Sequence, residues 1–138
     1  MNKNKYWLAR ISIWFSFSVL FLIGYWILCP FKVLELKNIK LSSQTVNRGE
    51  HLIISADYCK YVDKQADLFV SFVDGVIYNT PPQVINLEKG CGTTNLSIYI
   101  PKALPTGTYT LKGVFRYKVN PIKTLEVTYF TEQFTIVK

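Results

Sequence analysis

Residues that hold metals or move protons are scarce in this chain. Its 138 residues include one His, one Met and three Cys, which leaves little material for a metal site or for His-based catalysis. Only 18% of the residues are charged and 49% are apolar, which excludes a disordered chain. Seven Gly and six Pro, without a repeat, exclude collagen and a regular coiled coil. We therefore expect one ordered domain of ordinary size and no cofactor.

A long uncharged stretch lies near the start of the chain. From Ile11 to Leu28 the sequence reads ISIWFSFSVLFLIGYWIL, without a proline. As a helix this stretch would span roughly 27 Å, close to the hydrocarbon thickness of a bilayer. The sequence therefore predicts a transmembrane helix over residues 11–29, preceded by a cytoplasmic tail over residues 1–10 and ended by Pro30.

Residues at both ends of this stretch are typical of membrane interfaces. The aromatic rings that would form an interfacial belt are Tyr6, Trp7, Tyr25 and Trp26. Arg10 can extend its guanidinium group from the first turn toward the lipid headgroups. We predict that Trp7, Arg10, Tyr25 and Trp26 anchor the helix.

A cleaved signal peptide and a lipoprotein signal are the two alternatives to an uncleaved anchor. A cleaved signal peptide has an apolar region of about 7–15 residues followed by small residues at the cut. Here the apolar run is longer, and it ends in Trp26, Ile27 and Leu28. A lipoprotein signal would place small residues directly before Cys29, where this chain has Ile27 and Leu28. The uncleaved anchor fits the sequence better than either alternative.

The charges around the helix leave its orientation open. Three cations precede it and three closely follow it: Lys3, Lys5, Arg10, Lys32, Lys37 and Lys40. Because the amino-terminal tail is too short to hold a domain, the question is which side of the membrane residues 31–138 occupy. The cysteines bear on that question.

After residue 30 the pattern changes to an alternation with a period of two. The clearest strand is Thr108–Asn120, whose odd-numbered positions form an apolar face: Tyr109, Leu111, Gly113, Phe115, Tyr117 and Val119. Weaker strand patterns cover residues 31–41, 52–58, 68–73, 76–78, 83–87, 94–100, 123–130 and 133–137. Seven to nine short strands in about 105 residues predict an all-β, two-sheet sandwich over residues 30–138.

One short motif narrows the fold. The segment Leu104-Pro105-x-Gly107-x-Tyr109 resembles the corner of immunoglobulin-like and fibronectin-like domains. In those domains a Tyr at the start of a late strand bonds back to nearby backbone. The resemblance covers about fifteen residues and implies an immunoglobulin-like sandwich, without implying a function.

The sequence departs from antibody domains in its core residues. No Cys follows Tyr109 by two residues, and no Trp lies after Trp26. Other aromatic side chains must fill the core, and the residues expected there are Phe69, Phe72, Phe115, Tyr117 and Phe134.

Cys59 and Cys91 both lie in the β domain beside expected loops. A disulfide between them would stabilise the domain by about 3–4 kcal/mol in the chain-entropy model. We predict this disulfide, the alternative being two unrelated buried thiols. It would place residues 31–138 in an oxidising compartment, with the amino terminus in the cytoplasm. Cys29 is expected to be a free thiol, an acylation site or an intermolecular bridge.

Residues suited to catalysis or metal binding have simpler interpretations. His51, the only imidazole, lies at a strand start, where a solvated position explains it better than a role as a base. Zinc coordination by His51, Cys59 and Cys91 lacks the close paired spacing of usual sites. Three acids, Asp57, Asp63 and Asp67, cluster in the segment Ala56–Leu68. Lysines among them favour a surface loop over a calcium site, so we predict neither a metal nor an enzyme.

The positive charge of the chain suggests one binding face. Sixteen Lys and Arg oppose nine Asp and Glu, giving a net charge of +7, and three of the cations precede the helix. Lys112, Arg116 and Lys118 share the wet face of the strand at 108–120. They would meet an acidic partner, anionic glycans or lipid headgroups, unless they form only a solvated face. A membrane location argues against nucleic acid.

The sequence as a whole predicts a single-pass membrane protein that presents a sandwich outside the cytoplasm. It would act by binding a protein in or near the same membrane, as an adaptor or a receptor-like subunit. The alternative is a structural subunit of a larger membrane or envelope assembly, phage-derived or secretion-type, in which the helix packs laterally and the chain forms an oligomer.

Overall fold

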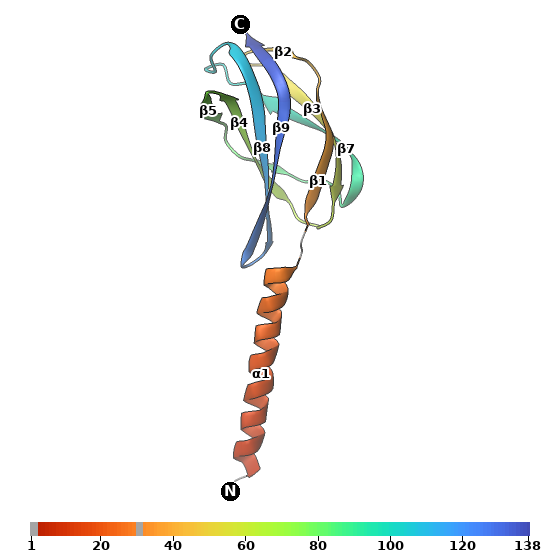
Figure 1. The fold of residues 1–138 in the computed structure, drawn as a ribbon, viewed down its shortest axis with the longest axis vertical. Helices are drawn as coiled ribbons and strands as arrows, with labels where there is room; N and C mark the ends of the chain where they lie inside the picture. The colour runs from red at the N-terminus through yellow and green to blue at the C-terminus, as the bar shows by residue number, and fades with distance from the viewer. Residues whose placement is uncertain (1–2, 30–31) are drawn as a thin grey trace.

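The structure, a computed structural model, describes residues 3–29 and 32–138. Within these residues the chain forms one helix, α1 (Lys3–Leu28), followed by nine strands. Figure 1 shows that α1 projects as a rod from one end of the strand domain, while the C-terminus lies at the opposite end of that domain. The predicted combination of one amino-terminal apolar helix and an all-β domain is confirmed.

The helix is apolar on every side. Its segment Arg10–Leu28 has a mean hydropathy of 2.0 and is long and apolar enough to cross a membrane. An uncleaved anchor and a signal sequence share these properties. α1 begins at Lys3, so residues 3–10 of the predicted tail are helical. Pro30, the predicted helix end, lies outside the described residues.

Two sheets form the β domain. The smaller sheet is antiparallel and has the order β1–β3–β7, with strands β1 (Leu34–Leu41), β3 (His51–Lys60) and β7 (Gly90–Tyr99). The larger sheet has the order β2–β9–β8–β4–β5, and β6 also pairs with β4. Its strands are β2 (Thr45–Asn47), β4 (Ala66–Asp74), β5 (Val76–Asn79), β6 (Gln83–Ile85), β8 (Gly107–Asn120) and β9 (Lys123–Val137).

Most strands lie where the sequence predicts them, with two differences. The patterns at 123–130 and 133–137 belong to one continuous strand, β9, which pairs with β8 along its whole length. The sequence does not predict β2, a three-residue strand that pairs in parallel with the end of β9. The predicted alternation in β8 is confirmed, since Tyr109, Phe115 and Tyr117 on its odd-numbered face are buried.

The core lies between the two sheets. Four of the aromatic residues expected there are fully buried: Phe72, Phe115, Tyr117 and Phe134. The prediction for Phe69 is wrong. Its neighbours Leu68 and Val70 are buried, and successive side chains of a strand alternate between faces. The ring of Phe69 therefore lies on the outer face of the larger sheet, where it is half-buried.

The predicted tyrosine corner is present. The hydroxyl of Tyr109, near the start of β8, donates a hydrogen bond of 3.0 Å to the carbonyl of Pro105. The turn before β8 is thereby fixed to the strand that follows it. Together with the two-sheet topology, this corner defines the domain as an immunoglobulin-like sandwich.

Candidate functional site

The predicted disulfide is confirmed. Cys59 and Cys91 are bonded and are direct partners on the neighbouring strands β3 and β7, with a sequence separation of 32. The crosslink therefore joins two strands of the smaller sheet, whereas the disulfide of antibody domains joins the two sheets. Cys29 is a free, half-buried cysteine outside this bond.

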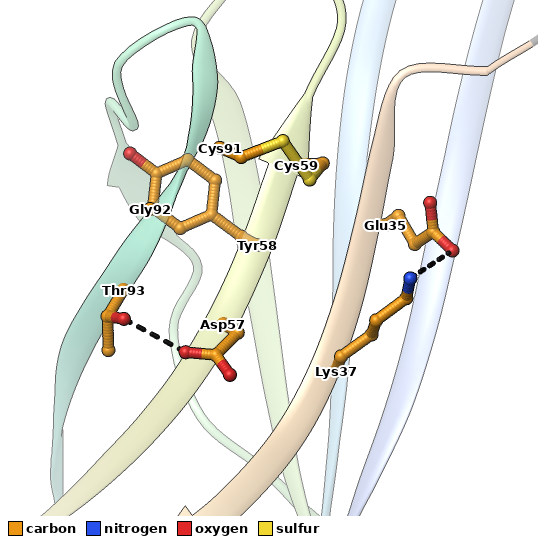
Figure 2. A pocket seen from close by; sticks show the side chains of 8 residues that line it. All are labelled: Glu35, Lys37, Asp57, Tyr58, Cys59, Cys91, Gly92 and Thr93. Atoms are coloured by element: carbon orange, nitrogen blue, oxygen red, sulfur yellow. Dashed lines mark hydrogen bonds and ion pairs between the residues drawn. A yellow bond between two sulfur atoms is a disulfide. The ribbon is translucent and has the colours of Figure 1, made fainter.

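The outer face of the smaller sheet, which we call the disulfide face, contains a shallow groove. Figure 2 shows the groove between side chains of β1, β3 and β7, with the disulfide at one end. Its volume is about 350 Å³. The ring of Tyr58 lies beside Gly92, 3.5 Å from where a Cβ would stand, which is an ordinary van der Waals contact.

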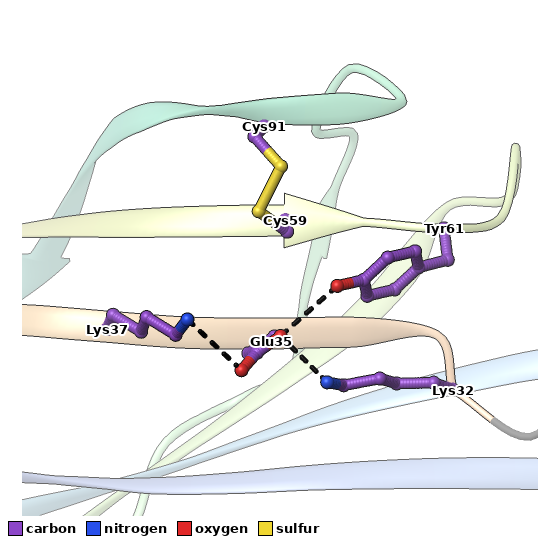
Figure 3. A network of polar contacts seen from close by, with 6 residues as sticks. All are labelled: Lys32, Glu35, Lys37, Cys59, Tyr61 and Cys91. Carbon is purple, nitrogen blue, oxygen red and sulfur yellow. Dashed lines mark hydrogen bonds and ion pairs between the residues drawn. A yellow bond between two sulfur atoms is a disulfide. The ribbon is translucent and has the colours of Figure 1, made fainter.

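Glu35 is the centre of an ion network on the disulfide face (Figure 3). Lys32 Nζ donates a hydrogen bond of 2.7 Å to Glu35 Oε2, and the hydroxyl of Tyr61 donates one of 3.1 Å to the same oxygen. Lys37 Nζ lies 3.4 Å from Glu35 Oε1. The bond from Lys32, followed by those from Tyr61 and Lys37, lowers the pKa of Glu35 to about 2. Its negative charge is thus matched within the face.

Asp57 links the three strands of the same sheet. Its two carboxylate oxygens accept hydrogen bonds from Asn38 Nδ2 at 2.7 Å and from Thr93 Oγ1 at 2.9 Å. These bonds hold the pKa of Asp57 below its usual value. Asn38 has φ 51° at an irregularity in β1, a conformation that Asn tolerates better than most residues. Polar groups of the disulfide face therefore bond mainly to one another.

The predicted binding residues Lys112, Arg116 and Lys118 all lie on the outer face of the larger sheet, which we call the lysine face. Arg116 Nε donates a hydrogen bond of 2.8 Å to Glu126 Oε1, and its guanidinium lies 4.5 Å from the centre of the Phe69 ring. Lys112 and Lys118 have no charged partner among the described residues. The three predicted cations are therefore not equivalent, since two of them keep an unmatched charge.

Apolar side chains lie between these cations, and the sequence analysis does not place them on this face. Register places Phe69, Val114 and Thr128 in one row across β4, β8 and β9, and it places Lys112 directly opposite Phe130. The side chain of Phe130 is 58% exposed. The alternation in β9 is the sequence signal that could have predicted the exposure of Phe130. Tyr129 is buried, and the next side chain along a strand points to the opposite face.

The residues weighed for catalysis or metal binding do not gather at one place. His51 is exposed and its ring packs against Tyr99, with the ring centres 5.4 Å apart. Asp57 is bonded on the disulfide face, whereas Asp67 lies opposite Arg116 on the lysine face. Asp63 is exposed between β3 and β4. Within the described residues, no three His, Cys, Asp or Glu side chains come close enough to hold a metal ion.

The β8–β9 hairpin contacts the end of α1, and no sequence pattern predicts this contact. Asn120 Nδ2 donates hydrogen bonds to the carbonyls of Trp26 at 2.7 Å and Cys29 at 3.4 Å. Lys123 Nζ donates to the carbonyls of Ile27 at 2.9 Å and Leu28 at 3.4 Å. Of the predicted anchor residues, Trp7, Arg10 and Tyr25 are exposed, and Trp26 is half-buried.

Lys60 is a further residue that the sequence prediction omits. It is only 2% exposed, and its Nζ donates a hydrogen bond to the carbonyl of Leu87 in the segment between β6 and β7. The sequence does not predict that Lys60 is buried, because a lysine at the end of a strand is expected to be exposed. The contact fixes that segment beside the start of β1, because Lys60 is the register partner of Leu34.

Comparisons with known proteins concern the fold alone. No protein-family model matches the chain, and no curated protein matches it either. Among solved structures, a Niemann-Pick type C2 protein from the Japanese carpenter ant is similar at 16% identity, with a TM-score of 0.49, over 75% of this chain and 96% of that one. The sporulation control protein Spo0M of Bacillus subtilis is similar at 10% identity, with a TM-score of 0.42, over 77% of this chain and 50% of that one.

Proposed function

We propose that this chain is a membrane-anchored binding module that acts without catalysis. In this proposal α1 remains in the bilayer, and the sandwich presents its lysine face to a protein partner outside the cytoplasm. The partner would carry acidic groups around an apolar patch, the chemistry that complements Lys112, Lys118 and Phe130.

The lysine face carries this proposal. Phe130 is exposed directly beside Lys112, and neither Lys112 nor Lys118 has a charged partner among the described residues. On the disulfide face, in contrast, the charge of Glu35 is matched by neighbouring lysines. Exposed apolar groups next to unmatched charges are typical of recognition surfaces.

Two contacts support a retained helix and an external sandwich. Asn120 and Lys123 of the sandwich bond to the carbonyls of residues 26–29, so cleavage after α1 would break contacts of the folded domain. The Cys59–Cys91 disulfide is typical of an oxidising compartment, which supports an extracytoplasmic sandwich with a cytoplasmic amino terminus.

The test uses the full chain, extracted in mild detergent from the membranes in which it occurs, as bait for copurifying proteins. We expect Lys112→Glu combined with Lys118→Glu to abolish capture of a discrete partner. The matched control reverses two exposed lysines away from the lysine face, Lys64→Glu with Lys102→Glu, and should leave capture unchanged. Equal capture by both double variants would contradict the proposal.

A second candidate is a structural subunit whose helix packs laterally against other helices. It is favoured by the exposed rings of Trp14 and Phe21 in the middle of α1. Replacing residues 11–28 with a leucine-alanine helix of equal length separates the two candidates. Loss of the partner after this replacement would favour lateral packing, whereas retention would favour recognition by the sandwich.

A further inference from the structure

The end of α1 has a complete set of hydrogen-bond partners. The last turn of a helix leaves carbonyls without partners from within the helix. The N–H of Cys29 bonds to the carbonyl of Tyr25 at 2.8 Å, so the carbonyls that follow are those of residues 26–29. Residue 30 is a proline, which has no N–H to donate to the carbonyl of Trp26.

The hairpin supplies the missing donors. Asn120 reaches the carbonyls of Trp26 and Cys29, and Lys123 reaches those of Ile27 and Leu28. All four remaining carbonyls are therefore contacted by two side chains more than ninety residues away in sequence. The ammonium group of Lys123 also lies at the negative end of the helix dipole, where a cation is favoured. Such contacts matter most next to lipid, where little water is present to replace them.

These contacts fix the level of the hairpin relative to the helix. Figure 1 shows the β8–β9 hairpin extending beyond the rest of the sandwich to the end of α1. Tyr25 and Trp26 are aromatic residues of the kind that mark a membrane interface, and the carbonyl of Trp26 is the one that Asn120 contacts at 2.7 Å. If α1 crosses a bilayer, the hairpin tip must lie at the depth of this aromatic belt.

The tip is suited to that depth. Its outermost residues are Pro121 and Ile122, and the side chain of Ile122 is 56% exposed although it is apolar. Beside it, Lys123 can direct its ammonium group to the helix carbonyls while its aliphatic stem remains near lipid. An exposed isoleucine flanked by the polar side chains of Asn120 and Lys123 fits the boundary between headgroups and acyl chains.

We propose that the tip of the β8–β9 hairpin, residues 120–123, is a second membrane contact of this protein. Resting on the proposed membrane anchoring, this inference assigns lipid at the headgroup–acyl boundary as the ligand of Ile122. Asn120 and Lys123 hold the tip at that depth. The sandwich is thereby attached to the membrane at two points and keeps a defined orientation above it.

The test measures the depth of residue 122 in the full chain. An environment-sensitive fluorophore is attached to Cys in Ile122→Cys, in a Cys29→Ser background and without reductant, so that Cys59 and Cys91 stay bonded. The labelled protein is reconstituted into phosphatidylcholine vesicles with and without lipids that carry a nitroxide high on the acyl chain. The matched control carries the label at the exposed residue Lys102, which precedes the start of β8, whereas the hairpin tip follows the other end of that strand.

We expect the label at residue 122 to emit at shorter wavelength than the label at residue 102 and to be quenched by the nitroxide lipid. Equal, water-like emission at both positions in protein that floats with the vesicles would overturn the membrane contact alone. Protein that fails to float would overturn the anchoring as well. Flotation thus separates the failure of this inference from the failure of the proposed function.

A second variant tests the two side chains that hold the tip. Asn120→Ala with Lys123→Ala removes the donors to the helix, so quenching of the label at residue 122 should fall. Thr124→Ala, at an exposed neighbouring position, is the matched control and should leave quenching unchanged. Unchanged quenching in the double variant would overturn the role given to Asn120 and Lys123.

Discussion

The two outer faces of the sandwich differ in what their polar groups bond to. On the disulfide face, Glu35 and Asp57 each accept hydrogen bonds from more than one neighbour, and a disulfide joins the adjacent strands. On the lysine face, Arg116 pairs with Glu126 and Ser71 donates a hydrogen bond to Asn79. Lys112 and Phe130 lie side by side there, and Lys112 has no charged partner among the described residues. One face holds its own sheet together, and the other keeps two lysines without a charged partner among the described residues.

Because of this difference, we expect substitutions on one face to affect stability and substitutions on the other to affect partner binding. Changes on the disulfide face should lower the free energy of unfolding without changing partner binding. Changes on the lysine face should weaken partner binding without changing unfolding, because exposed substitutions usually alter stability by no more than about 0.5 kcal/mol. A substitution that lowered both stability and partner binding would contradict this division between the two faces.

Removal of the disulfide should have the largest effect. Cys59→Ala with Cys91→Ala opens a crosslink with a sequence separation of 32. It should lower the free energy of unfolding by about 3–4 kcal/mol in the chain-entropy model. Denaturant unfolding of the full chain in detergent, followed by the tyrosine signals of the sandwich, measures this loss. Cys29→Ala is the control and should leave the unfolding midpoint unchanged.

Phe130 should contribute to binding and not to stability. We expect Phe130→Ala to weaken partner binding by about tenfold, as expected for an aromatic residue within an interface. Ile53→Ala is the matched control, since Ile53 is an exposed apolar residue of β3, 45% exposed, on the disulfide face. Binding by the purified partner, titrated against both variants, decides between them. A greater loss for Ile53→Ala would assign recognition to the opposite face.

Asp57 should contribute to stability by a smaller amount than the disulfide. Asp57→Ala leaves the side chains of Asn38 and Thr93 without their shared acceptor, so the denaturant midpoint should fall. Asp63→Ala, in the exposed segment before β4, should not move the midpoint. Equal midpoints for the two variants would show that the bonds of Asp57 contribute no stability.

Glu35 should give the smallest effect, and only in acid. Its pKa falls from an ordinary value of 4.5 to about 2 in the folded chain. A carboxylate with a lowered pKa stabilises the fold fully above its ordinary pKa, and this stabilisation is lost as the pH falls from 4.5 toward 2. Unfolding midpoints measured across this range should fall more steeply for the natural chain than for Glu35→Gln. Parallel slopes would contradict the role of the Glu35 network.

The sequence predicts the strands whose patterns are local. In β8 the alternation is long enough to define both faces, and Pro105 and Tyr109 mark the corner before it. β2 has only three residues, and its pairing with the end of β9 depends on a contact across most of the domain. Phe69 shows that residue type alone does not identify the core. Its position along β4 places its side chain on the outer face, although the side chain is aromatic.

The candidate site is less accessible to sequence reasoning than the fold. Alternation alone places Lys112, Arg116 and Lys118 on one face, but the pairing of Arg116 with Glu126 depends on the register of β8 against β9. The contact of Asn120 with the helix joins residues 94 positions apart. Such contacts arise from tertiary geometry and leave no periodic signal in the chain.

The central claim is that the lysine face meets a protein partner while the disulfide face does not. A photo-crosslinking residue placed at Thr128, exposed on β9 beside Val114, tests the first face in native membranes. The same residue at Ser97, exposed on β7 beside Ile53, tests the second. We predict one discrete crosslinked product from position 128 and none from position 97. Crosslinks from position 97 alone, or from neither position, would contradict the claim.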